Sequence, residues 1–258
     1  MKIVLEVWRQ DGPDAPGAFV TYPAEEVHED ASLLETLDTL NDHLIERGDT
    51  AITFDHDCRE GICGACSMTI DGVPHGPGLR TTTCQIYMRQ FPDGATVRLE
   101  PFRATTFPVV RDLMVDRSAL DRIQQAGGYT GVDAGPMPEP NANPIGQEDA
   151  EEAIDAAICI GCGACVAACP NGAAMLFTGA KVTHLAKLPQ GQAARYPRVQ
   201  DMVDQMDAEG FGGCTNFGEC EAVCPQGISI RVIGRLNREQ LTGVLAHPRN
   251  PRGGMLPQ

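Results

Sequence analysis

The chain is poor in basic residues. It contains 20 Lys and Arg against 35 Asp and Glu, which gives a formal net charge of -15 at pH 7. Nucleic-acid phosphates and anionic lipid headgroups both attract basic surfaces, so this composition argues against binding to either. A basic protein partner would complement the charge better.

Long apolar runs and the common catalytic motifs are also missing. The chain has no run of the roughly 20 apolar residues needed to span a bilayer. Its N-terminus, MKIVLEVWRQ, lacks the apolar core of a signal peptide and a twin arginine, so we expect the chain to stay in the cytoplasm. The sequence has no Gly-rich phosphate loop, nucleophile elbow or H-E-x-x-H motif, which indicates that substrate chemistry takes place on another chain.

Cysteine is abundant, and the eleven Cys fall into three groups of four, four and three. The first group has the C-x4-C-x2-C spacing of a plant-type [2Fe-2S] loop, with a fourth cysteine farther along the chain. These ligands are Cys58, Cys63, Cys66 and Cys84. Gly61 and Gly64 lie inside the loop, where missing side chains let backbone N-H groups approach the sulfurs.

The other seven cysteines predict two neighbouring clusters. One run has the spacing C-x2-C-x2-C-x3-C-P, whose fourth cysteine normally binds the other cluster, so we expect the two segments to exchange ligands. The predicted [4Fe-4S] ligands are Cys159, Cys162, Cys165 and Cys224. The predicted ligands of the second cluster are Cys169, Cys214 and Cys220.

The last segment lacks one cysteine of the usual run. Phe217 stands where that ligand would fall. Three thiolates suit a [3Fe-4S] cluster, and an apolar side chain at the vacant corner would help to exclude a fourth iron and water. A [4Fe-4S] cluster with a non-cysteine ligand is the alternative.

Other uses of cysteine fit less well. An odd count, close C-x2-C spacing and the missing export signal argue against disulfides. Structural zinc takes four ligands, and eleven does not divide by four, although a zinc-stabilised interaction protein stays the alternative from another class. Rieske chemistry needs histidine ligands, but no His lies within the cysteine motifs, and we expect His56 in a surface loop.

Periodicity predicts a sheet and a helix in the first part of the chain. Residues 3–7 and 96–100 are predicted to be strands from their period-2 pattern. Ser32 and Glu35 have the spacing of a capping box, and the leucines after them recur at helical spacing. The Asp-Gly pair at 71–72 predicts a hairpin turn.

The rest of the chain is predicted to be helical. Helices are expected over residues 148–158, 198–209 and 228–246. The segment 127–147 is rich in Gly and Pro and predicts an irregular connector, and the tail from 247 is expected to be disordered or extended.

The predicted fold class is α+β with two domains. Residues 1–105 are expected to form a plant-type ferredoxin-like (β-grasp) domain that binds [2Fe-2S]. Residues 106–258 are expected to form an all-α, bacterial-ferredoxin-like domain that binds [4Fe-4S] and [3Fe-4S] clusters.

Four segments carry a resemblance to a known family. They are CREGICGAC from Cys58, FPVVRDLMVD from Phe107, CIGCGACVAACP from Cys159 and CTNFGECEAVCP from Cys214. In this order they resemble the iron-sulfur subunit of succinate dehydrogenase and fumarate reductase. The resemblance implies electron transfer through three clusters between the FAD of a flavoprotein subunit and quinone at a membrane anchor. The iron-sulfur subunit of another flavoprotein oxidoreductase is the alternative.

The resemblance also implies a location and an anchor type. The chain would lie at the cytoplasmic face of the bacterial membrane, peripheral through its partner subunits. Members of this family whose quinone site adjoins the [3Fe-4S] cluster commonly have Trp and His at two positions that here are Ala174 and Thr215. This departure favours the branch with a cytochrome b-type anchor that carries haem b and uses menaquinone.

Overall fold

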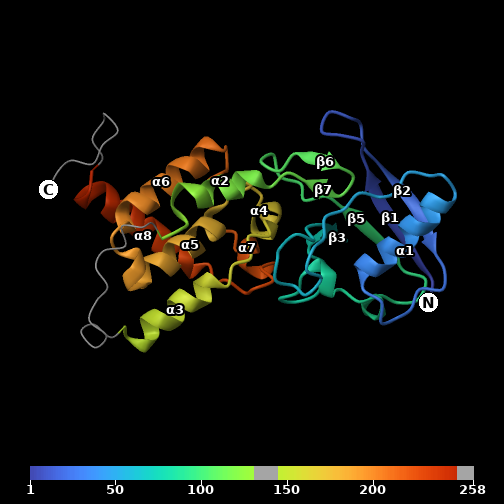
Figure 1. Cartoon of the computed structure of the whole chain (residues 1–258), viewed down its shortest axis with the longest axis horizontal. Helices are drawn as coiled ribbons and strands as arrows, with labels where there is room; N and C mark the ends of the chain where they lie inside the picture. The colour runs from blue at the N-terminus through green and yellow to red at the C-terminus, as the bar shows by residue number, and fades with distance from the viewer. Residues whose placement is uncertain (131–144, 249–258) are drawn as a thin grey trace. The chain divides into compact units, whose positions relative to one another are not determined.

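The chain divides into two units in a computed structural model that describes residues 1–130 and 145–248 (Figure 1). The first unit comprises Met1–Arg117, Ile160–Gly172 and Ala222–Gly227. The second unit comprises Ser118–Cys159, Ala173–Glu221 and Ile228–Gln258. Both later cysteine segments therefore contribute residues to each unit, and the predicted domain boundary after residue 105 stays a prediction.

A five-stranded sheet forms the body of the first unit. Its strands are β1 (Ile3–Arg9), β2 (Ala18–Ala24), β3 (Thr69–Ile70), β4 (Val73–Pro74) and β5 (Thr96–Glu100). The order is β2-β1-β5-β3-β4, in which β1 pairs antiparallel with β2 and parallel with β5. The two strands predicted from alternation are thus central neighbours, and a separate ribbon pairs β6 (Val109–Arg111) with β7 (Met114–Val115).

Helix α1 (Leu33–Glu46) covers one face of this sheet (Figure 1). The predicted capping box is confirmed: the Ser32 hydroxyl accepts from the Glu35 N-H, and the Glu35 carboxylate accepts from the Ser32 N-H. Such a cap stabilises a helix by about 1 kcal/mol. It fixes where the helix begins, so that its leucines face the sheet.

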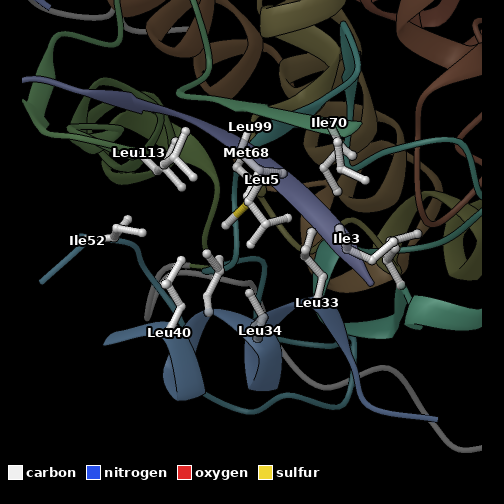
Figure 2. Close-up of a cluster of buried hydrophobic side chains, with 14 of the residues drawn as sticks. Ile3, Leu5, Leu33, Leu34, Leu40, Ile52, Met68, Ile70, Leu99 and Leu113 are labelled. Atoms are coloured by element: carbon white, nitrogen blue, oxygen red, sulfur yellow. The ribbon is translucent and has the colours of Figure 1, made fainter. Parts of the chain in front are cut away.

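The core lies between α1 and the sheet (Figure 2). Leu33 and Leu34 point from the helix toward Leu5 on β1, and all three are fully buried. Each such side chain contributes about 1.5–3 kcal/mol through burial. Val4 and Glu6, which lie between Ile3, Leu5 and Val7, stay partly exposed, as period-2 alternation predicts.

The predicted hairpin behind the first cysteine loop is confirmed. Strands β3 and β4 pair antiparallel across the turn, where Asp71 and Gly72 have φ of 49° and 82°. Two consecutive residues with positive φ form the turn type that matches the twist of a hairpin, and Asp-Gly favours it. The first strand of this hairpin, β3, begins shortly after Cys66 and pairs with β5.

Five helices pack together in the second unit. They are α2 (Ser118–Gly127), α3 (Gln147–Ala157), α5 (Met175–Lys187), α6 (Arg195–Ala208) and α8 (Arg231–Ala246). Helix α5 contacts α3, α6 and α8, and α2 packs against α6. The approach of α5 to α8 needs a glycine, because a Cβ on Gly179 would lie 2.7 Å from the carbonyl oxygen of Val232. Within residues 1–130 and 145–248, none of the helices combines the length and apolar character needed to cross a membrane.

Charged side chains join these helices at their edges. Lys187 on α5 forms ion pairs with Asp149 and Glu152 on α3. Glu239, which is almost fully buried on α8, accepts from Arg195 on α6 and pairs with Arg235 one turn before it. The buried carboxylate thus has two cationic partners, which a charge removed from water requires.

The three predicted helices are confirmed with small shifts at their ends. Helix α6 begins three residues early because Pro197 is tolerated in a first turn, and α8 begins three residues late. Helices α2 and α5 were not predicted. Most of the connector at 127–147, and nearly all of the tail from 247, lie outside the described residues. The remaining short helices are α4 (Ala164–Ala168), α7 (Glu219–Ala222), η1 (Thr83–Gln85), η2 (Met88–Gln90) and η3 (Pro189–Gly191).

Asp112 in the β6–β7 turn ties distant segments of the first unit together. Its buried carboxylate accepts from the backbone N-H groups of Gln10 and Thr53 and forms a 3.0 Å ion pair with Arg9. Asp112 has φ of 46°, a left-handed conformation that Asp and Asn tolerate better than Ala. The Asp112 carboxylate therefore holds the β6–β7 turn against the segments of Gln10 and Thr53.

Asp112→Ala should lower the free energy of unfolding by about 3–5 kcal/mol, because it leaves a half-buried guanidinium without its carboxylate. Asp112→Asn keeps the backbone conformation and one acceptor oxygen, so its loss should be smaller. Urea unfolding followed by the fluorescence of Trp8, the single Trp, measures both. Equal midpoints for Asp112→Ala and the wild type would contradict this role.

Candidate functional site

The first cysteine loop, residues 58–66, turns through left-handed backbone at three positions. Arg59, Gly61 and Gly64 have φ of 55°, 79° and 71°. Glycine adopts this conformation without strain, which explains the two glycines, whereas Arg59 is held there with its side chain paired to Asp38 on α1. The repeated reversal curls the loop, so that its amides point toward its own sulfurs.

Backbone amides donate to the sulfurs of this loop. The N-H of Glu60 lies 3.3 Å from Sγ of Cys58, and the N-H of Ala65 lies 3.4 Å from Sγ of Cys63. The N-H groups of Glu60 and Ile62 lower the pKa of the Cys58 thiol to about 7. Amides that stabilise a thiolate also stabilise the negative charge of a cluster, which raises its potential.

The structure brings Cys84 back to the same loop. The amide and thiol of Cys84 approach Cys66, and burial raises the pKa of the Cys66 thiol to about 12. Sγ of Cys84 lies 3.2 Å from the Thr82 hydroxyl and 3.7 Å from the Gln85 amide nitrogen. Cys58 meanwhile contacts Cys63, so the four predicted [2Fe-2S] ligands form two adjacent pairs in one unit.

His75 holds the segment that carries Cys84. Its Nδ1 accepts from the backbone N-H of Thr83 at 3.3 Å and lies 3.0 Å from the Thr83 hydroxyl. Burial lowers the pKa of His75 to about 4, so the ring is neutral at pH 7. Sequence reasoning missed His75, because it is eight residues from Thr83 and carries no motif. His56, in contrast, is exposed, as predicted.

The later cysteines lie in both units. The first unit contains Cys162, Cys165, Cys169 and Cys224. The second unit contains Cys159, Cys214 and Cys220. No helix begins at the fourth cysteine of the run: Cys169 caps the C-terminus of α4, and the next helix begins at Met175 after the turn at Gly172. The exchange of ligands between the two segments stays a prediction.

The segment around Cys214 repeats the amide pattern of the first loop. The N-H of Asn216 lies 3.4 Å from Sγ of Cys214, which is again a donor two residues after the cysteine. Asn216 and Gly218 have positive φ of 63° and 88°, and Phe217 between them is 61% exposed in the chain by itself. The same local geometry therefore serves cysteines in both units.

The donor set fits iron-sulfur clusters. Thiols with backbone N-H groups directed at them, in a loop of left-handed turns, match what a cluster needs from its protein. Across residues 1–130 and 145–248, no group of three or more His, Cys, Asp or Glu side chains is arranged to hold a single metal ion. Which thiol binds which cluster stays a prediction.

Gly64 and Gly61 offer a matched test of this loop. A Cβ on Gly64 would lie 2.5 Å from the carbonyl oxygen of Ile160, whereas one on Gly61 would lie 3.1 Å from the flexible hydroxyl of Thr82. Gly61→Ala should lower the free energy of unfolding by about 1–2 kcal/mol, because alanine is strained in left-handed backbone. Gly64→Ala should lower it by more and should also reduce the iron content of the protein. Urea unfolding measures the first effect, and iron analysis measures the second. Equal losses in the two variants would contradict the close approach of Ile160.

In comparison with known proteins, both cysteine regions match families that bind iron-sulfur clusters. Residues 4–122 match the family model described as 2Fe-2S iron-sulfur cluster binding domain, and residues 158–228 match the one described as 4Fe-4S dicluster domain. A solved chain of the Mycobacterium smegmatis Sdh1 complex in the apo form has a similar fold. Its TM-score is 0.62 at 21% identity, over 96% of this chain and 99% of that chain.

Two relatives are similar in sequence over most of their length. The succinate dehydrogenase iron-sulfur subunit of Bacillus subtilis is 33% identical over 74% of this chain and 72% of the relative. The fumarate reductase iron-sulfur subunit of Mycobacterium tuberculosis is 30% identical over 93% of this chain and 92% of the relative. With both cysteine regions matched and these identities sustained over such lengths, the chain belongs to the family of iron-sulfur subunits of succinate dehydrogenase and fumarate reductase.

Proposed function

We propose that this chain is the electron-transfer subunit of a succinate:quinone oxidoreductase. It passes electrons between the FAD of a flavoprotein subunit and quinone at a membrane anchor, while succinate and fumarate are interconverted at the partner's flavin. The observation that carries the proposal is the loop 58–66, whose amides donate to its own cysteine sulfurs. All eleven cysteines then have a place in three clusters in series.

The residues of the first site act by holding and tuning a [2Fe-2S] cluster. When bound, such a cluster accepts and releases one electron at a time. The proposed ligands are Cys58, Cys63, Cys66 and Cys84. The amides of Glu60 and Ala65 stabilise the added negative charge, and the left-handed Gly61 and Gly64 keep side chains away from the sulfurs. Burial of Cys66 and Cys84 excludes water from one side of the site.

The two later segments are proposed to hold the other clusters by exchanging ligands. The [4Fe-4S] ligands are Cys159, Cys162, Cys165 and Cys224. The [3Fe-4S] ligands are Cys169, Cys214 and Cys220. Phe217 occupies the position of the missing cysteine and supplies no fourth thiolate. The amide of Asn216, directed at Sγ of Cys214, plays the part there that Glu60 plays in the first loop.

The two halves of the chain are proposed to be ferredoxin-like domains. Residues 1–105 form a β-grasp domain, which the central pairing of β1 with β5 and the crossing α1 support. Residues 106–258 form a bacterial-ferredoxin-like helical domain. Each cluster-binding loop is thereby attached to a rigid element, as precise spacing between clusters requires.

The partners follow from the family and the composition. A flavoprotein subunit with FAD would dock on this acidic chain, and a cytochrome b-type anchor with haem b would hold the complex at the cytoplasmic face of the membrane. Ala174 and Thr215 replace the Trp and His of quinone sites beside a [3Fe-4S] cluster, which favours menaquinone bound on the anchor. The net charge of -15 argues against nucleic acid as a partner.

Low-temperature EPR of the purified complex tests this function. We expect a [3Fe-4S] signal in the oxidised state and [2Fe-2S] and [4Fe-4S] signals after reduction. A colourless, iron-free preparation that contains zinc would support an interaction protein instead. Three clusters beside a partner that lacks covalently attached FAD and does not turn over succinate or fumarate would indicate another flavoprotein oxidoreductase.

A further inference from the structure

Two backbone carbonyl oxygens from distant parts of the first unit share the same two donors. The hydroxyl of Ser67 lies 3.1 Å from the oxygen of Gly64 and 3.0 Å from that of Cys162. Nη1 of Arg117 donates to the same two oxygens at 2.7 and 2.9 Å. Gly64 follows Cys63, and Cys162 is a proposed [4Fe-4S] ligand. This carbonyl clamp, made by Ser67 and Arg117, therefore joins two cluster-binding loops.

The loops are held tightly around the carbonyl clamp. A Cβ on Gly64 would come within 2.5 Å of the Ile160 oxygen, and one on Gly163 would come within 2.9 Å of the Phe107 ring. Ser67 itself is buried. The first contact joins the backbones of the two loops, and the second packs the later loop against the Phe107 side chain. A shift of the later loop would therefore break both contacts.

Two donors are needed at this point. Both carbonyl dipoles present their negative ends to the same two atoms, so the oxygens repel each other unless positive charge lies between them. Ser67 has one hydroxyl proton for two acceptors, whereas Nη1 of Arg117 carries two N-H groups and can serve both. Arg117 is accordingly the stronger half of the carbonyl clamp.

The charge of Arg117 changes the pKa of two neighbouring side chains. Burial lowers the pKa of His75, and Arg117 lowers it further. Burial raises the pKa of Asp55, and Arg117 opposes that rise. A half-buried guanidinium that acts on two side chains also acts on a cluster beside it, because solvent screens it weakly.

We propose that Ser67 and Arg117 are positioning residues for electron transfer between the [2Fe-2S] and [4Fe-4S] clusters. The carbonyl clamp fixes the separation of the two loops, and the guanidinium raises the reduction potential of the [2Fe-2S] cluster. The step is the transfer of one electron from one cluster to the other, without a bond or a proton changing place. This inference rests on the proposed function.

Arg117→Gln and Arg117→Lys separate position from charge in the assembled, iron-loaded complex. Both variants lose the guanidinium that spans the two carbonyls, but only Gln loses the charge. The readouts are the midpoint potential of the [2Fe-2S] cluster and the relaxation of its EPR signal by the reduced [4Fe-4S] cluster, which weakens with distance. We expect weaker relaxation in both variants and a more negative potential in Arg117→Gln alone.

Arg98→Gln is the matched control. Arg98 belongs to the same unit and pairs with Glu6 on the sheet, so its loss should leave both readouts at wild-type values. Ser67→Ala should weaken the relaxation less than the Arg117 variants, with an unchanged potential. If Arg117→Gln loses iron, Arg117→Lys and Ser67→Ala decide, and wild-type relaxation in both overturns the inference.

The wild-type complex separates the two failures. If it lacks the [2Fe-2S] or the [4Fe-4S] signal, the proposed function fails and the carbonyl clamp fails with it. If both signals are present, and the Arg117 variants match Arg98→Gln in potential and relaxation, only the carbonyl clamp fails.

Discussion

Phe217→Cys should replace the [3Fe-4S] signal of the complex with that of a [4Fe-4S] cluster. The new thiolate would complete the C-x2-C-x2-C-x3-C-P spacing and provide the ligand that a fourth iron needs. The oxidised, as-prepared complex should then lose its [3Fe-4S] EPR signal, because an oxidised [4Fe-4S] cluster of this type is diamagnetic. The added anionic ligand should also lower the reduction potential. Turnover with quinone should fall, because the last cluster of the series would then be harder to reduce.

The surroundings of Phe217 make this a clean experiment. The side chain is 61% exposed, so the substitution removes no core packing. Phe217→Ala is the control, because it removes the aromatic ring without adding a ligand and should keep the [3Fe-4S] signal. An unchanged spectrum in Phe217→Cys would contradict the ligand assignment for the last segment.

Cys169→Ser and Cys224→Ser should damage different clusters. If the two segments exchange ligands, Cys169→Ser should abolish the [3Fe-4S] signal and leave the [4Fe-4S] signal, and Cys224→Ser should do the reverse. Serine keeps the size of the side chain, and its hydroxyl is a poor ligand where a thiolate is needed. EPR and iron analysis of the two purified complexes measure the effect.

Without exchange of ligands, the results would be inverted. Cys169→Ser would then lose the [4Fe-4S] signal that Cys159 supports, and Cys224→Ser would lose the [3Fe-4S] signal. Cys84→Ser controls for general disruption, because it should remove the [2Fe-2S] signal alone.

Local signals predicted much of the first unit. The capping box at Ser32, the alternation in β1 and β5, and the Asp-Gly turn each act over a few residues, so the chain adopts them wherever the core allows. The sheet order was not predicted, because strand pairing depends on contacts between segments far apart in sequence.

Helices α2 and α5 show where periodicity fails. Most residues of α5 are buried, including Thr178 and Thr183, and its partly exposed polar side chains are confined to a narrow stripe. The helical period of its apolar residues is therefore weak. Helix α2 is short and directly follows a strand ribbon. Both are held by packing within the second unit rather than by a local signal.

The candidate site, too, was predicted only where its signal is local in sequence. Cysteine spacing is local, and it predicted the segments that match cluster-binding families. The donors that join two of these segments were missed, because Ser67 is 95 residues and Arg117 is 45 residues from Cys162. Only the folded chain brings them together.

The most direct test is an experimental density map of the iron-loaded complex that resolves each cluster and its bonded sulfurs. The account predicts Cys224 on the same core as Cys159, with Cys169 on a three-iron core beside Cys214 and Phe217 at the vacant corner. A map with Cys169 and Cys159 bonded to one core would contradict it.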